Sequence, residues 1–295
     1  MRSNNVLGFI FAATLDDKIP ELASSRTTAS VPIGGKYRII DFDLSNMSNS
    51  GISNVGIVAK SNFQSLMDHV GSGSAYDFSK RRSNLSILPP YDGKAFSSFV
   101  ETIYNMHGYI EHCREEYVLI SQGNVITNID YTDVFDFHSK KKADITLIYK
   151  NHAIPQGYDR PITLDVDNDG KVNQIFVKPG VVDKGVFNHA YGSILIKKDL
   201  LMSEIRNAIS VNQLDVKRLL QSSLGKYSIY AYENKGYCAA ISSINDYFEF
   251  NMDLMKKEVR DELFNPQRPI YTKVRDDAPS RYGPTSNVKN SIIAQ

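Results

Sequence analysis

Short apolar runs alternate with longer amphipathic stretches along much of the chain. The runs are residues 6–13, 52–59, 117–121, 144–149 and 192–196. The connections between them are long enough to hold helices, and runs in this arrangement are typical of strands that are buried on both faces of a largely parallel sheet. The pattern therefore predicts an α/β protein.

Three of the intervening stretches predict further elements. Residues 37–50 have apolar side chains at close to helical spacing, and the Asn and Gly at Asn49 to Gly51 end the stretch, which predicts a helix; residues 99–113 predict another. Residues 165–171 (DVDNDGK) combine turn residues with flanking β-branched residues, which predicts a hairpin and an antiparallel addition to the sheet. A calcium loop is the alternative for this segment, but no bidentate Glu follows at the required distance.

The composition after Leu254 indicates a domain boundary. A charged helical stretch runs to Leu263 and is followed by two prolines, Pro266 and Pro269. We therefore predict a first domain of residues 1–254, followed by a linker and the start of a second domain in residues 255–295. The tail beyond Ser280 has aliphatic residues near hexapeptide spacing, as in the opening coil of a parallel β-helix. One coil cannot bury its own face, so the second domain is expected to be cut short.

Charge and cysteine content narrow the possible partners and location. The chain has 34 Lys and Arg residues and 33 Asp and Glu residues, so its net charge is +1. This balance does not indicate binding to nucleic acid or to an anionic membrane. The two cysteines, Cys113 and Cys238, have no metal-binding spacing and need no oxidising compartment. These observations predict a cytoplasmic protein whose partners are small molecules or other proteins.

The first apolar run could be mistaken for a targeting segment. Residues 6–13 have roughly the length of the hydrophobic region of a signal peptide. However, Asp16, Asp17 and Lys18 follow at once, with no small-residue cleavage site between, and the run is far too short to span a bilayer. A buried first strand is the favoured interpretation.

One long motif resembles a known family. Residues 31–51, VPIGGKYRIIDFDLSNMSNSG, resemble a segment of the bacterial glucose-1-phosphate adenylyltransferases (ADP-glucose pyrophosphorylases) that reads close to PFGGKYRxIDFxLSNxxNSGI. Support comes from residues 247–254 (YFEFNMDL) and from the stretch PIYTKVRDDAPSRYG that begins at Pro269. The resemblance implies a Rossmann-like nucleotidyltransferase domain with a mixed, mostly parallel sheet, followed by the first residues of a left-handed β-helix.

The resemblance also implies a reaction with strict chemical needs. The family joins glucose 1-phosphate to ATP, forming ADP-glucose for glycogen synthesis and releasing pyrophosphate. A phosphate oxygen attacks the α-phosphorus of a triphosphate, so such a site needs a closely approaching backbone, cations on the phosphates and carboxylates that hold Mg²⁺.

The phosphate-binding positions implied by the resemblance have been replaced. The family's loop GGxGxRL corresponds to Ala13, Thr14, Leu15, Asp16, Asp17, Lys18 and Ile19. The glycines are absent, and two carboxylates stand where a polyanionic substrate would lie. Lys18 stands at the place of the catalytic Arg. A lysine ammonium does not replace the planar, bidentate guanidinium of an arginine. The family's phosphate-neutralising Lys corresponds to Thr28. ATP is not expected to bind in the family's pose.

The metal-binding and sugar-binding positions are altered too. The two aspartates that hold Mg²⁺ in the family correspond to Asn124 and Ala240, so we predict no metal cofactor and assign no catalytic residue. The sugar-binding segment E-K-P corresponds to residues 177–179, which keep Lys178 and lose the Glu, and Phe99 stands where the family has Thr. No histidine has a spacing that suggests a ligand role.

Several basic residues are candidates for binding. Arg26 lies where the resemblance places an anionic effector pocket, and Lys36 and Arg38 belong to the GGKYR motif. For Lys36 and Arg38 an effector or subunit contact competes with a purely structural role, in which Gly34 and Gly35 form a turn and the charges cap the following helix. The basic residues 80–82 are interpreted as a solvated loop.

These observations favour a GlgD-type, non-catalytic subunit that assembles with a catalytic paralogue of glucose-1-phosphate adenylyltransferase, with an anionic sugar phosphate as a possible effector. One alternative is an active nucleotidyltransferase with a rebuilt site, using Lys18, Lys178 and carboxylates such as Asp16, Asp17 or Asp130. Another is a free-standing anion sensor that uses Arg26 and Lys36.

Overall fold

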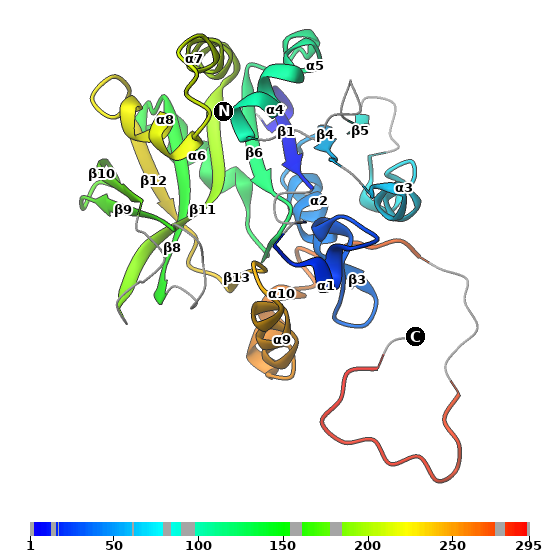
Figure 1. Cartoon of the computed structure of the whole chain (residues 1–295). Helices are drawn as coiled ribbons and strands as arrows, with labels where there is room; N and C mark the ends of the chain where they lie inside the picture. Colours follow the sequence, from blue (N-terminus) through cyan, green and yellow to red (C-terminus); the bar gives the residue numbers. More distant parts are fainter. Residues whose placement is uncertain are drawn as a thin grey trace.

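A mixed β-sheet forms the centre of the computed structural model (Figure 1). The structure describes residues 3–12, 16, 18–60, 62–78, 84–89, 98–153, 161–177, 185–274 and 281–293. Over these residues the main sheet has nine strands, in the order β10-β9-β11-β6-β1-β4-β5, with β8 pairing β11 and β12. The α/β class predicted from the sequence is confirmed.

One half of the sheet is parallel. Its strands are β6 (Tyr117–Gln122), β1 (Val6–Phe11), β4 (Asn54–Val58) and β5 (Asn84–Leu88). All six residues of β1 are buried, because helices cover both faces of the sheet at this point. The first apolar run is therefore a buried strand, as predicted, and it ends at Phe11.

The other half contains the antiparallel pairs. The long β11 (Val186–Lys197) runs antiparallel to β6, β8 (Ile145–Ala153) and β9 (Ile162–Val166), and β12 (Ile229–Glu233) lies parallel to β8. The predicted hairpin is confirmed: β9 and β10 (Val172–Val177) are joined by a turn in which Asp167 Oδ1 accepts hydrogen bonds from the backbone N–H groups of Asp169 and Lys171.

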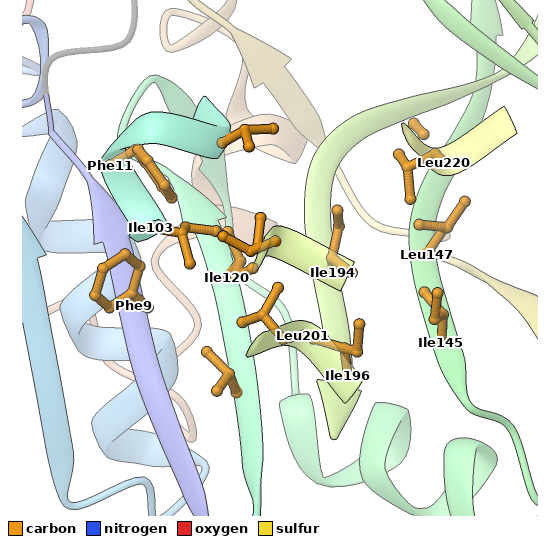
Figure 2. Close-up of a cluster of buried hydrophobic side chains, with 14 of the residues drawn as sticks. Phe9, Phe11, Ile103, Ile120, Ile145, Leu147, Ile194, Ile196, Leu201 and Leu220 are labelled. Carbon is orange, nitrogen blue, oxygen red and sulfur yellow. The ribbon is translucent and has the colours of Figure 1, made fainter. Parts of the chain in front are cut away.

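Two groups of helices cover the two faces of the sheet. One face is covered by α4 (Phe99–Asn105), α5 (His107–His112), α7 (Lys198–Ser210) and α8 (Val216–Ser223). The other is covered by α2 (Ile39–Asn49), α3 (Gln64–Val70) and α6 (Tyr131–Lys141). Figure 2 shows the first core, in which Phe9 and Ile120 of the sheet lie beside Ile103 of α4 and Leu201 of α7.

Two predicted helices differ from their expected bounds. The helix expected over residues 99–113 is interrupted at Met106, whose φ and ψ of −93° and 8° lie outside the helical region, so α4 and α5 are separate. The helix expected over residues 37–50 begins at Ile39. Tyr37–Arg38 form the short strand β3, which pairs with β2 (Pro32–Ile33) across a turn at Gly34 and Gly35, both at positive φ.

The residues after Leu254 continue the packing of the first domain. A third core joins α1 (Pro20–Ala23) and the β2–β3 hairpin to α9 (Ile244–Asp253) and α10 (Lys257–Leu263). In it Val259 and Leu263 pack with Ile39 and Phe42 of α2. The third core therefore includes residues beyond Leu254, up to Ile270.

The described part of the C-terminal tail contains no regular element. Residues 281–293 have neither helix nor strand, and Val288, Ile292 and Ile293 are exposed. The opening coil of a β-helix stays a prediction for this segment. Among the described residues, no helix is both long enough and apolar enough to cross a membrane.

Candidate functional site

The replaced positions gather where the parallel strands β1 and β6 end. The backbone N–H of Gly123, just after β6, donates to Phe11 O at 2.8 Å, and that of Ala29 donates to Ala12 O at 3.1 Å. A Cβ on Gly123 would lie 2.9 Å from Phe11 O and 3.0 Å from the Cβ of Ala29, so only glycine fits this close approach. The carboxyl ends of parallel strands are the usual position of ligand sites in α/β proteins.

The two positions of the expected metal ligands are brought together by a small sheet. β7 (Val125–Thr127) pairs with β13 (Cys238–Ala240), with Val125 opposite Ala240. Asn124 precedes β7, and its carbonyl accepts a hydrogen bond from Ile241 N at 2.9 Å, while its Nδ2 donates to Ile241 O at 3.2 Å. Asn124 and Ala240 are therefore neighbours, although they are far apart in the sequence.

These residues do not fit a magnesium ion. Asn124 is buried, and its Oδ1, the only side-chain oxygen that the pair offers, has no hydrogen-bond partner among the described residues. Ala240 has no donor and is packed in a small apolar cluster with Val125, Tyr191 and Cys238. Mg²⁺ is normally held by one or two carboxylates together with substrate phosphates, and this pair supplies no carboxylate.

The first loop is tied down by one of its own carboxylates. Asp16 Oδ1 accepts hydrogen bonds from both the backbone N–H and the Oγ1 of Thr28, each at 2.7 Å. Thr28 is buried and begins the short helix η2 (Thr28–Ser30). Asp16 stands at a replaced position of the phosphate loop, and Thr28 stands where the family has its lysine. The two replacements therefore contact each other in this structure.

Of the other candidate positions in the first loop, the structure describes Lys18. Lys18 is exposed in a turn before α1. Ala13, Thr14, Leu15 and Asp17 lie outside the described residues, and so does Lys178.

We expect Asp16→Ala to lower the free energy of unfolding by about 1–2 kcal/mol, since it removes two hydrogen bonds to a charged acceptor and leaves a buried donor on Thr28 unsatisfied. Urea unfolding measures the change. Asp136→Ala, at an exposed acidic position in the middle of α6, is the matched control and should cost far less. Equal losses in the two variants would show that the Asp16–Thr28 contact contributes nothing of its own.

The binding candidates have different roles in the structure. The Nη1 of Arg38 donates to Ser65 O at 2.9 Å and to Ser65 Oγ at 2.6 Å, so its side chain fastens α3 to the start of α2. The backbone N–H of Arg38 is capped by Asp41 Oδ2 at 2.8 Å, which supports the structural interpretation of this motif. Lys36 is exposed, with its Nζ 5.1 Å from the ring centroid of Tyr37, and Arg26 is half-buried. The last two stay candidates for anion binding.

Asp130 has a structural role at the start of α6. It is the N-cap of α6, accepting hydrogen bonds from Thr132 N at 2.9 Å and Thr132 Oγ1 at 2.6 Å, and it pairs with Arg268 at 2.7 Å. Its recruitment as a metal or phosphate ligand, considered from the sequence, stays an alternative; in this structure its oxygens hold the start of α6 and the segment after α10.

A cluster that the sequence did not reveal lies beside Ala240. Tyr191 Oη is 2.5 Å from His152 Nε2, which is 3.3 Å from His189 Nδ1, and the rings of Tyr191 and His152 are stacked. Burial lowers the pKa of His152 to about 4 and that of His189 to about 3, and raises the pKa of the Cys238 thiol to about 12. The cluster is thus uncharged at neutral pH.

One cation that acts on this cluster, Lys150, has a structural role. Lys150 Nζ donates to the carbonyls of Lys235 at 2.7 Å and Gly236 at 2.6 Å. No local sequence pattern predicts the cluster, because its members come from β8, β11 and β13 and meet only through the pairing of strands. The two histidine rings are neutral at pH 7 and add no positive charge for a triphosphate.

A buried carboxylate lies behind the end of β6. Asp43 of α2 accepts a hydrogen bond from Ser121 Oγ at 2.5 Å, and its Oδ2 has no partner among the described residues. Burial raises the pKa of Asp43 to about 7, with the Ser121 hydrogen bond acting in the opposite direction. Burial, and after it the charge on Asp43, raises the pKa of Tyr131. This buried group contacts the end of β6, close in the chain to where the replaced positions gather.

The chain belongs to the nucleotidyl transferase family, whose model matches residues 17–257. Its relatives include glycogen biosynthesis proteins and glucose-1-phosphate adenylyltransferases, as the sequence motifs implied. The glycogen biosynthesis protein GlgD of Geobacillus stearothermophilus is 35% identical over 99% of this chain and 76% of its own length. GlgD of Bacillus subtilis is 28% identical over 100% and 76%. The glucose-1-phosphate adenylyltransferase of Clostridium acetobutylicum is 30% identical over 100% and 79%.

A solved structure supports the fold independently. The crystal structure of a putative glucose-1-phosphate thymidylyltransferase from Bacillus anthracis, in complex with a sucrose, superposes with a TM-score of 0.69. The match covers 89% of this chain and 98% of that chain at 13% sequence identity. At this identity the likeness establishes the nucleotidyltransferase fold, with its mixed, mostly parallel sheet, and nothing about substrate.

Proposed function

We propose that this chain is a GlgD-type subunit of a cytoplasmic glucose-1-phosphate adenylyltransferase, that it transfers no nucleotidyl group itself, and that it modulates a catalytic paralogue by assembling with it. The relatives include both GlgD proteins and glucose-1-phosphate adenylyltransferases, so similarity alone supports either an active or an inactive role. The site supports the inactive one.

The observation that carries the proposal is the pairing of Asn124 with Ala240. The small sheet β7–β13 keeps the two positions adjacent, as a metal site requires, but neither residue has a carboxylate. Nucleotidyl transfer develops charge on the phosphates, and metal ions and cations supply most of its stabilisation. A chain that keeps the scaffold of such a site without its charges is better suited to binding a partner than to turnover.

The first loop also supports a chain without catalytic activity. Asp16 is held against Thr28 by two short hydrogen bonds, so a negative charge is fixed where the resemblance places a polyanionic substrate. Two like charges close together in a poorly solvated site repel by on the order of several kcal/mol. Triphosphate binding would have to displace the carboxylate or accept this repulsion.

Pyrophosphate release tests the catalytic half of the proposal. With Mg²⁺, ATP and glucose 1-phosphate, the purified chain should show no turnover, and a rate within tenfold of an ordinary enzyme's roughly 10 s⁻¹ would contradict it. Asn124→Asp should also stay inactive, because groups that act as a unit are non-additive and Ala240, Lys18 and Thr28 remain replaced. Robust activity in that single variant would show that the rest of the site is competent.

The proposed regulatory role is tested with the catalytic paralogue from the same organism. We expect the two chains to co-purify, and the paralogue's kcat or its half-saturating substrate concentration to change at least about twofold when this chain is added at equimolar concentration. An unrelated protein at the same concentration is the control. Co-purification without a kinetic effect would leave a structural subunit, and the absence of both would contradict the assembly role.

A further inference from the structure

A row of buried polar side chains follows one side of α2. Asp43, Asn46 and Ser50 recur at intervals of three and four residues, so they lie on one face of the helix and at its end. All three are buried, although these residue types are mostly exposed in proteins. We call this row the polar seam. It binds residues 121–131, which we call the site segment because it contains Asn124 and β7.

The two neutral members of the polar seam hold the later part of the site segment. Asn46 Nδ2 donates to Thr127 O at 2.8 Å, and Asn46 Oδ1 accepts a hydrogen bond from Ile129 N at 3.2 Å. Ser50 Oγ accepts a hydrogen bond from Tyr131 N at 2.9 Å. None of these amide and hydroxyl groups changes its charge between pH 4 and pH 9. This part of the site segment is therefore held in the same way throughout that range.

The third member, Asp43, holds the beginning of the site segment. Its Oδ1 accepts a hydrogen bond from Ser121 Oγ at 2.5 Å, and its Oδ2 has no hydrogen-bond partner among the described residues. Two residues after Ser121, the N–H of Gly123 donates to Phe11 O at 2.8 Å, which joins the site segment to the end of β1. The only titratable member of the polar seam thus lies where the site segment meets the sheet.

The ionisable groups near this end of the polar seam do not offset a negative charge. They come from α2, α6, β13 and the segment after α10, and are Asp41, Tyr131, Cys238 and Arg268. Burial raises the pKa of Tyr131 and of the Cys238 thiol, so both stay neutral. Arg268 is the one cation of this set, and it pairs with Asp130 at 2.7 Å. Burial accordingly raises the pKa of Asp43 to about 7.

We propose that Asp43 is a pH-sensitive switch for the site segment: the segment is closed on α2 while Asp43 is protonated, and its beginning opens when Asp43 ionises. Opening lets water reach the carboxylate, which removes most of the cost of burying its charge. Asn46 and Ser50 keep the later part attached, so the movement is a local hinge opening and not unfolding of the domain. The proton thereby becomes a regulatory ligand of the candidate site. This inference goes beyond the proposed function and does not depend on it.

The direction of the pH dependence follows from the two states. In the closed state the pKa of Asp43 is about 7, and in the open, solvated state it returns towards the ordinary value of 3.8. Between pH 4 and pH 7, opening therefore releases a proton. The opening equilibrium constant should rise by up to about tenfold per pH unit in this window and level off above it.

Hydrogen exchange at the backbone N–H of Gly123 measures the opening, because in the closed state this group donates to Phe11 O. After correction for the intrinsic effect of pH on exchange, its rate should rise at least about tenfold from pH 5.5 to pH 7. Asp43→Asn should abolish the rise, since asparagine keeps the shape of the side chain and does not titrate. Ser50→Ala is the matched control: it removes a neutral contact, so exchange should be faster at every pH with the pH dependence unchanged.

Dilute urea separates the local opening from global unfolding. A local opening exposes little surface, so exchange at Gly123 should stay nearly constant up to about 1 M urea, while amides of β12 that exchange through global unfolding should accelerate. Equal acceleration at Gly123 and in β12 overturns the proposal. So does a pH dependence that survives Asp43→Asn or disappears in Ser50→Ala, or an exchange rate at Gly123 that does not change with pH in the parent. The measurement uses neither substrates nor a partner chain, so its outcome is independent of the proposed function.

Discussion

Ala240→Asp is expected to lower the free energy of unfolding by about 3 kcal/mol without creating a metal site. Ala240 is buried, and its methyl group packs against Val125, Tyr191 and Cys238. A carboxylate at this position would have to be desolvated among these three neighbours, none of which is a cation. The nearby Lys150 already donates to two backbone carbonyls, and His152 is kept neutral by burial, which lowers its pKa to about 4.

Urea unfolding at pH 8 measures the cost, and Ala240→Asn is the matched control. Asn has nearly the same shape as Asp without its charge, so the difference between the two variants isolates the carboxylate. If both lose the same stability, crowding against Tyr191 is the whole effect and the electrostatic argument fails.

The double variant Asn124→Asp with Ala240→Asp extends this test to the metal. Two adjacent carboxylates should be still less stable in the absence of metal, since their charges repel. We expect about 10 mM Mg²⁺ to recover less than 1 kcal/mol, because a bound ion stabilises the fold only in proportion to its affinity and Tyr191 fills the space beside residue 240. Full recovery by Mg²⁺ would show that a competent metal cavity persists in this chain.

The fold could be predicted from the sequence where burial alone decides the structure. The apolar runs at β1, β4 and β6 are strands because helices cover both of their faces, and the spacing of apolar residues located α2 to within two residues at its start. The break at Met106 could not be predicted, because the apolar spacing continues through it while the backbone leaves the helical region for one residue.

The candidate site shows the same division. The family resemblance identified Asn124 and Ala240 as the two metal-ligand positions. The pairing of β7 with β13 is the physical reason that these two residues are neighbours. The hydrogen bonds between Asp16 and Thr28 could not be read from the chain, because they depend on how the first loop folds back on η2. The His152–Tyr191 contact depends on the register of two strands in the sheet and has no local pattern.

Asp43→Asn is expected to stabilise the protein at pH 8 by on the order of 2–4 kcal/mol and to change how stability depends on pH. Asp43 is buried, and burial raises its pKa from 3.8 to about 7 in the folded state. Between pH 4 and 7 the folded protein therefore retains a proton that the unfolded chain has released. The free energy of unfolding falls as the pH rises through this window and levels off above it, because a buried charge must then be tolerated.

Asparagine removes the titration and keeps the size of the side chain. Its variant should lack the Asp43 contribution to the slope between pH 4 and 7, so the two stability curves should converge towards pH 4 and diverge towards pH 8. Buried histidines act in an overlapping window with the opposite sign: burial lowers the pKa of His138 and His152 to about 4, so their contribution is lost as the pH falls. The difference between the variant and the parent cancels these terms and isolates Asp43.

Chemical denaturation at intervals from pH 4 to pH 9 gives both curves. Asp136→Asn, at an exposed acidic position of α6, is the control and should follow the parent throughout. Ser121→Ala adds a second check: it removes the hydrogen bond that opposes the rise in the pKa of Asp43, so it should move the midpoint of the titration to higher pH. A difference between Asp43→Asn and the parent that stays constant from pH 4 to pH 9 would show that Asp43 does not titrate in this range.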